Sequence, residues 1–344
     1  MKRRILSRLV LLALSGCAAK PAAEPPAVSV ASAADGAPAT SGAPAATAAS
    51  ATSETDRVQK GRAKAEAAHQ AELQRWTPEL RAASKRLAET SYPSVDAALK
   101  AALASPHRQP SNAARDEFRH PRETLEFLGL QPSSAVLEYG PGGGWYTELL
   151  APALAKRGKL FVTSDDPNGT SEGAVYGYRL KLLLETSPEL FGKVEAIPVQ
   201  QKNPKLPLEG KLDLVLVIRE LHNLVNDGSI DLWLAEFKRA LKPQGVLGIV
   251  DHRGLPGADP QKSSKLGYLP EAWAIEKIEA AGFKLSAKSE INANPKDTKD
   301  YPDGVWTLPP TYRLGDKDRD KYAAIGESDR FTLRFVKAPP PRPH

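Results

Sequence analysis

The chain has 344 residues, with 47 Lys and Arg against 41 Asp and Glu, 41% apolar residues and a single cysteine. This is the composition of a globular protein, and one cysteine excludes both an intramolecular disulfide framework and a structural metal site built on several cysteines. The net charge of +6 would suit a nucleic-acid partner. However, we find no ribbon of basic and aromatic residues and no recognition motif, so we expect none.

The first 16 residues have the pattern of a secretory signal peptide, because basic residues precede an apolar run too short to span a membrane. The run Leu14-Ser15-Gly16-Cys17 resembles the lipobox of bacterial lipoproteins. The resemblance implies cleavage before Cys17 and lipid on that residue, which would anchor the chain in the bacterial envelope. Ala18 resembles lipoproteins sorted to the outer membrane, facing the periplasm. Cleavage would lower the net charge from +6 to +2, since only basic residues are lost.

Low-complexity sequence is predicted on both sides of the folded part. Residues 17–55 are almost entirely Ala, Pro, Ser, Thr and Gly, and we expect a disordered tether because they cannot bury enough surface to offset their ordering entropy. Residues 339–344 are a Pro-rich tail.

A helical N-terminal segment is predicted over 56–119. It begins with a charged helix at 56–76 whose apolar positions are mostly alanine. Thr77-Pro78 is typical of a helix cap followed by a first-turn proline, and Ser94 is expected to begin a third helix. A further helix is expected to begin at His120-Pro121.

From Ser134 onward, short Val, Ile and Leu runs alternate with helical patterns. The run 214–218 has no polar alternation, which indicates a strand buried on both faces. Residues 120–338 are therefore predicted to be an α/β domain with a doubly wound, mostly parallel, seven-stranded sheet. Strands are expected at 135–139, 159–164, 194–199, 212–218, 246–251, 283–291 and 330–337, and helices at 145–156, 172–185, 229–241 and 270–281.

The strongest chemical signal is the run from Glu138 to Trp145, Glu-Tyr-Gly-Pro-Gly-Gly-Gly-Trp, between a predicted strand and a predicted helix. Glycines there let the backbone approach a ligand, and a helix N-terminus offers unpaired N–H groups. A dinucleotide fingerprint would need glycine at Trp145 or Thr147, and a P-loop would need a Gly-Lys-Ser/Thr run, which is missing. The acid at the strand end suits a cationic amine, so an amino-acid-bearing ligand is favoured. A tight turn without a ligand is the alternative.

With this motif, residues 120–338 resemble the class I S-adenosylmethionine-dependent methyltransferases, including the Leu241–Gly245 turn before strand five. Within that family they look most like exported bacterial predicted methyltransferases. The resemblance implies a Rossmann-like methyltransferase fold with S-adenosyl-L-methionine as cofactor. It also implies that Glu138 holds the cofactor's ammonium group and that three glycines line its methionine part: Gly140, Gly142 and Gly144.

The resemblance also assigns residues after strands two and three. The family usually has an acid after strand two that binds the ribose, and here Asp165 or Asp166 takes that place. After strand three, the usual adenine-contacting acid is replaced by Gln200-Gln201, which can donate a hydrogen bond but brings no charge.

Polar residues follow predicted strands four and five, at 219–223 and 251–253. We expect both groups beside the glycine loop, because the carboxyl ends of parallel strands share one edge of the sheet. A histidine there can act as a general base near neutral pH. The catalytic candidates are His222 or His252 as base, with Asn223 positioning the acceptor.

The neighbours of these histidines supply the remaining roles. Asp251 or Glu220 is expected to orient the imidazole, and Arg219 or Arg253 to hold an anionic substrate. The alternative is that each histidine only caps a helix or bonds a loop carbonyl. No metal site is expected, since the chain lacks a His-Glu-x-x-His run.

The connection 292–329 is longer than usual, and we expect it to be functional or a lid. Tyr301, Trp306 and Tyr312 are expected either to close over a ligand or to hold the loop on the domain.

Two functions remain open from the sequence. The first is a lipid-anchored S-adenosylmethionine-dependent methyltransferase that acts on a small molecule or an envelope component. The second is a non-catalytic ligand-binding or scaffold lipoprotein that retains the fold, because export separates the chain from the cytosolic cofactor. The sequence indicates neither the acceptor nor the oligomeric state.

Overall fold

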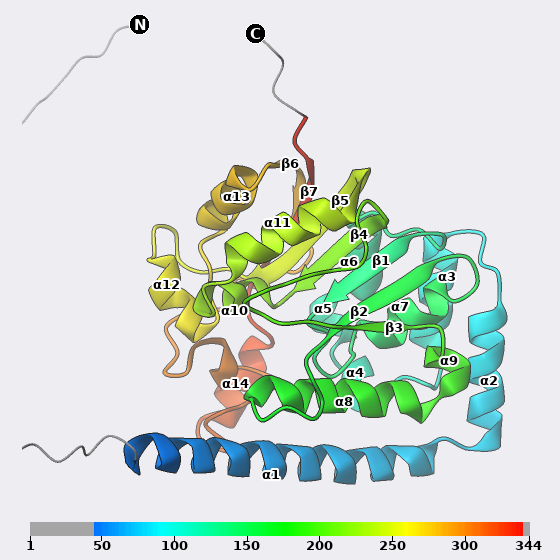
Figure 1. The fold of residues 1–344 in the computed structure, drawn as a ribbon, viewed down its shortest axis with the longest axis horizontal. Helices are drawn as coiled ribbons and strands as arrows, with labels where there is room; N and C mark the ends of the chain where they lie inside the picture. Colours follow the sequence, from blue (N-terminus) through cyan, green and yellow to red (C-terminus); the bar gives the residue numbers. More distant parts are fainter. Residues whose placement is uncertain (1–44, 340–344) are drawn as a thin grey trace, which may run out of the picture. The chain divides into compact units, whose positions relative to one another are not determined.

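Seven strands form one sheet at the centre of the protein (Figure 1). The computed structural model describes residues 45–339. The predicted signal peptide, Cys17, most of the tether and the tail beyond 339 lie outside the described residues. The strands are β1 (Ala135–Tyr139), β2 (Lys159–Ser164), β3 (Glu195–Pro198), β4 (Leu212–Ile218), β5 (Leu241–His252), β6 (Phe283–Ser289) and β7 (Arg330–Lys337).

The strand order is β3-β2-β1-β4-β5-β7-β6. The strands from β1 to β5 pair in parallel, whereas β7 runs antiparallel to both of its neighbours, β5 and β6. The predicted doubly wound, mostly parallel α/β sheet of seven strands is therefore confirmed.

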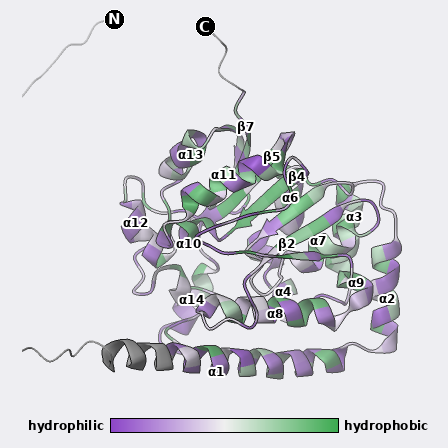
Figure 2. Ribbon diagram, viewed as in Figure 1, coloured by the Kyte–Doolittle hydropathy of each residue, from purple (hydrophilic) through white to green (hydrophobic). Residues whose placement is uncertain are grey.

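Each face of the sheet carries its own apolar core. Val136 and Leu214 point to one face, while the next residues, Leu137 and Val215, point to the other. The first core is covered by α2 (Pro78–Glu89), α3 (Val95–Ala104), α6 (Pro121–Phe127), α7 (Thr147–Leu154), α8 (Glu172–Thr186) and α9 (Pro188–Phe191). The second is covered by α10 (Leu221–Asn226), α11 (Ile230–Ala240) and α13 (Glu271–Ala280). Figure 2 shows the hydrophobic central strands between these layers.

The N-terminal helix α1 (Ala45–Arg75) lies along α8 (Figure 1). Arg62 donates to the Pro167 carbonyl, and the Tyr178 hydroxyl donates to Glu66 at 2.7 Å. Figure 2 shows that α1 is largely hydrophilic. Because α1 has few large apolar residues, these polar contacts hold it against α8 and the loop before it. Within 45–339, no helix is both long and apolar enough to cross a membrane.

The structure also differs from the prediction in several places. Helix α1 begins at Ala45, inside the predicted tether, in an alanine-rich stretch that favours helix. Residues 242–245, expected to be a turn, lie within β5, where the pairing with β4 shifts register. The connection 292–329 contains η2 (Gly304–Thr307) and α14 (Arg319–Ile325). Other short elements were not predicted: α4 (Pro110–Ala113), α5 (Asp116–Arg119), α9, α10, α12 (Pro260–Ser263) and η1 (Ser264–Leu266).

Candidate functional site

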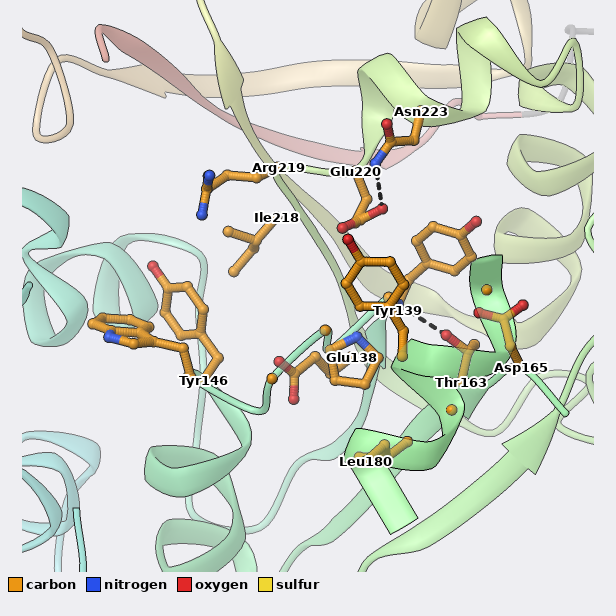
Figure 3. A pocket seen from close by; sticks show the side chains of 18 of the residues that line it. Glu138, Tyr139, Tyr146, Thr163, Asp165, Leu180, Ile218, Arg219, Glu220 and Asn223 are labelled. Carbon is orange, nitrogen blue, oxygen red and sulfur yellow. Dashed lines mark hydrogen bonds between the residues drawn. The ribbon is translucent and has the colours of Figure 1, made fainter. Parts of the chain in front are cut away.

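A cleft of about 810 Å³ lies at the carboxyl edge of the parallel strands and is lined by the residues that follow β1, β2 and β4. The chain builds the sheet from β1 towards β3, and then from β4 in the opposite direction. The cleft therefore lies at the switch in strand order, where open α/β sheets bind ligands. Figure 3 shows side chains from β1, β2 and β4 around it.

The glycine loop forms one wall of the cleft. Gly142 has φ +56°, and a Cβ built on it would meet nothing within 4 Å, so its backbone is open to a ligand. At Gly140 a Cβ would come within 2.7 Å of the Glu220 side chain. Gly144 does not line the cleft; it lies against α8, and a Cβ there would come within 2.0 Å of the Leu183 side chain. Of the three predicted ligand glycines, Gly144 instead permits close helix packing.

Glu138, at the end of β1, is a buried acid that lines the cleft (Figure 3). Its Oε2 accepts a hydrogen bond from Thr147 Oγ1 at 2.7 Å, while its Oε1 has no protein partner among the described residues. Burial raises the pKa of Glu138 to about 7, although the bond from Thr147 opposes that rise. A cationic ligand would return the carboxyl to its charged form, so the residue suits an amine.

The residues that follow β2 and β3 differ in whether they line the cleft. Asp165 lines the cleft, and partial burial raises its pKa. Asp166 is exposed, does not line the cleft, and accepts from the Asn168 N–H at 2.9 Å. Gln201 also lines the cleft, and its Oε1 accepts from the Tyr139 hydroxyl and the Trp233 indole. These two donors orient the Gln201 amide.

The predicted histidines meet at the floor of the cleft with Asp251, which is fully buried. His222 Nδ1 lies 2.9 Å from Asp251 Oδ1, and its Nε2 makes no hydrogen bond within the described chain. Both His252 nitrogens are engaged: Arg219 Nε donates to Nε2 at 3.3 Å, and the Ser328 hydroxyl bonds Nδ1. Only His222 therefore offers a free ring nitrogen to the cleft.

The pKa values of the two histidines are shifted in opposite directions. Burial lowers the pKa of His222, but Asp251 and Glu220 raise it more, so the net shift is upward. The pKa of His252 lies well below its ordinary value because of burial and the nearby Arg219 charge. Their ligand atoms and those of Asp251 lie within 4.8 Å of one another. The positively charged guanidinium of Arg219, which bonds His252, would repel a cation there, and we infer no metal site.

Other predicted residues have different partners from those expected. Asn223 donates to Glu220 Oε2 at 2.8 Å (Figure 3), so its amide orients that carboxyl. Burial raises the pKa of Glu220 to about 7. Arg253 does not line the cleft, because it bonds three acids: Glu271, Glu290 and Asp329.

The connection 292–329 combines the two expected roles. Trp306 lines the cleft, with the Arg313 guanidinium 4.8 Å from its ring centre. Tyr301 packs with Leu308 and Tyr322 in a small separate core, so it holds the segment in place. Tyr312 packs against that core rather than over the cleft.

Sequence reasoning missed Arg115, Arg119 and Tyr146, which also line the cleft; Figure 3 shows Tyr146 on the side opposite Asp165. Arg115 and Arg119 lie in a stretch of mixed charge around α5, and nothing in that stretch indicates proximity to the sheet edge. Figure 3 shows Tyr146 and Arg219 together on this side.

No family model matches the chain, and no curated protein matches it. Among solved structures it is similar to a SAM-dependent methyltransferase from Aquifex aeolicus, at 19% identity over 67% of this chain and 94% of that chain, with TM-score 0.44. It is similar to a putative sarcosine dimethylglycine methyltransferase from Galdieria sulphuraria, at 13% identity over 66% and 87%, with TM-score 0.46. It is also similar to the CcbJ methyltransferase from Streptomyces caelestis, at 14% identity over 67% and 94%, with TM-score 0.43. These TM-scores and identities are too low to support a function, which is therefore inferred from the residues of the cleft.

Proposed function

We propose that the chain is an S-adenosylmethionine-dependent methyltransferase. One observation carries the proposal: Glu138, buried at the end of β1, turns an unshared carboxylate oxygen to a cleft beside the open backbone of Gly142. A buried acid without a cation is unfavourable, and a ligand ammonium group would supply the missing charge. The sequence resemblance over 120–338 supports the same ligand.

The residues of the cleft fit this cofactor. Glu138 would hold the ammonium group, Gly142 would lie against the methionine part, and Asp165 would accept from the ribose hydroxyls. Gln201, oriented by Tyr139 and Trp233, would contact the base. When bound, the cofactor supplies an electrophilic methyl group on its sulfonium.

His222 is the general base in this proposal. Asp251 fixes its Nδ1, which leaves Nε2 able to take a proton from the O–H or N–H of an acceptor in the cleft. Asp251 also accepts from the His222 backbone N–H at 2.9 Å, so ring and backbone are held by one carboxylate. His252 stays neutral and is held in place by Arg219 and Ser328.

The test is binding of radiolabelled S-adenosylmethionine to the purified protein. Gly142→Val fills the open wall and should abolish binding, because its side chain occupies the ligand's space. Asp165→Asn should weaken binding about tenfold, as expected for losing one charge-assisted hydrogen bond. Asp166→Asn is the matched control, since that neighbour lies outside the cleft. Absence of binding by the wild-type protein, or equal binding by Gly142→Val, would refute the proposal.

We further propose that the protein is anchored in the bacterial envelope by lipid on Cys17, facing the periplasm, and that its acceptor is a small molecule or an envelope component rather than a nucleic acid. The lipobox-like run 14–17 supports the anchor. Membrane fractionation tests it: the wild-type chain should sediment with membranes, and Cys17→Ala should not. Cofactor binding without any methyl transfer to envelope extracts would favour a ligand-binding lipoprotein instead.

A further inference from the structure

One end of the cleft is lined by cationic side chains from distant parts of the chain. Arg115 precedes α5, Arg119 ends it, Arg219 follows β4, and Arg313 lies in the connection after β6. We call these four residues the arginine end. Tyr146 lines the same region, and Arg219 and Tyr146 lie together on the side opposite Asp165 (Figure 3).

One acid, Glu327, pairs with two of these four arginines and with the neighbouring Arg330. Glu327 accepts from Arg115 Nε at 2.8 Å, from Arg119 Nε at 3.0 Å and from Arg330 Nη1 at 2.7 Å. Among residues 45–339, Arg219 forms no ion pair, and the one hydrogen bond of its side chain is to the neutral His252. Arg313 also forms no ion pair with a described residue, and its guanidinium lies over the ring of Trp306, which lines the cleft. The positive charge at this end is therefore well in excess.

Several donors at this end are unused. Arg119 Nη2 is buried and has no hydrogen-bond partner within residues 45–339, and the Arg119 side chain is only 5% exposed. Neither Nη atom of Arg219 bonds to a described residue, and neither does the Tyr146 hydroxyl. An unmet buried guanidinium N–H is unfavourable, so such a group is expected to meet a ligand.

The electrostatics agree with this geometry. Burial raises the pKa of Glu327, but Arg330, Arg219 and Arg115 lower it more, and the net shift is downward. The pKa of Arg115 lies below its ordinary value, because burial and the charges of Arg219 and Arg330 outweigh Glu327. The guanidinium groups thus repel one another in the free protein, and an added anion would relieve that repulsion.

We propose that the arginine end binds an oxyanion, a carboxylate or phosphate group, of the methyl acceptor. The inference rests on the proposed function. Guanidinium groups match such oxyanions with paired N–H bonds. Arg219 touches His252, whose ring centre lies 5.4 Å from that of His222, so an anion here would place an acceptor beside the free His222 nitrogen. The other source of an oxyanion is the carboxylate of the cofactor itself.

The probe is inorganic phosphate, titrated into the full chain while the intrinsic tryptophan fluorescence is recorded; two of the five tryptophans, Trp145 and Trp306, line the cleft. Arg219 has φ +62°, a conformation that asparagine and glycine adopt readily, so Arg219→Asn and Arg219→Gly should fold. Each should weaken phosphate binding about tenfold or more, because charge-assisted bonds are lost. Arg122→Gln removes the same charge from a surface helix outside the cleft and should bind within twofold of wild type.

Saturating S-adenosylmethionine separates the two sources of the anion. If the arginine end serves the acceptor, phosphate affinity is unchanged by the cofactor; displacement of phosphate would overturn the assignment. So would a wild-type protein that binds no phosphate, or Arg219 variants that bind it normally. The phosphate titration needs no methyl transfer, so a protein that bound phosphate but no S-adenosylmethionine would contradict only the proposed function.

Discussion

Replacing Glu138 by glutamine should stabilise the free protein and at the same time impair its ligand binding. Glu138 is 4% exposed, and its one protein hydrogen bond comes from Thr147, which a glutamine oxygen can also accept. The substitution removes a charge that is unfavourable in the free protein. It also removes the group that is proposed to hold the cofactor's ammonium.

The magnitude follows from the pKa of Glu138, which burial raises from 4.5 to about 7. A tenfold change in an equilibrium corresponds to about 1.4 kcal/mol, so ionising this carboxyl in the folded state lowers stability by about 3 kcal/mol. Below pH 4.5 the group is protonated in both the folded and unfolded states and contributes nothing. The penalty grows as pH rises from 4.5 to 7, and it is fully present at pH 8.

Urea denaturation of wild type and Glu138→Gln at pH 5 and pH 8 measures this loss of stability. The variant should be more stable than wild type by only about 1 kcal/mol at pH 5 and by about 3 kcal/mol at pH 8. Wild-type affinity for S-adenosylmethionine should fall about tenfold from pH 8 to pH 6 as Glu138 is protonated. Glu220→Gln, which leaves Glu138 in place, should keep most of that dependence. A variant equally or less stable at pH 8 would refute the reasoning.

Three other outcomes follow from the described residues. Gly144→Ala should be about 1–3 kcal/mol less stable in urea than Gly142→Ala, because only the former places a methyl group on Leu183; equal losses would contradict the packing role. Asp251→Asn should lose about 3 kcal/mol, since a fully buried carboxylate accepts from three donors, and a loss near zero would refute this. Burial lowers the pKa of His107 from 6.5 to about 4, so protonation of the unfolded state removes stability as pH falls through that window. The free energy of unfolding of His107→Gln should therefore change less between pH 6.5 and 4 than that of wild type, as measured by urea denaturation at each pH; an equal change would contradict the assignment.

The central strands β1 and β4 and the second half of β5 could be predicted from sequence, because they are continuous apolar runs buried on both faces. Helix starts at Thr77 and Ser94 were also predictable, since each side chain accepts from the backbone N–H three residues on. The start of β5 was not, because residues 242–245 have turn composition yet lie within a strand whose register shifts.

The candidate site was predictable only where it follows a strand. Glu138 and His222 could be placed at the sheet edge from their position in the sequence. Arg219 could also be placed there, because it follows predicted strand four. Arg115 and Arg119 could not, since Arg119 and its partner Glu327 are 208 residues apart in the sequence. Asp165 and Asp166 could not be separated either, since the direction of each side chain depends on the loop backbone.

The position of β7 between β5 and β6 has a consequence for how the chain matures. β6 pairs with β7 alone in the sheet, so it has no partner strand until residues 330–337 have been synthesised. The same late segment brings Glu327, which joins Arg115 and Arg119. Both β6 and the Arg115–Arg119 side of the cleft therefore depend on residues after 326 for their partners. A nascent chain of this topology leaves β6 unpaired, and Arg115 and Arg119 without their carboxylate, until residues 327–337 are in place.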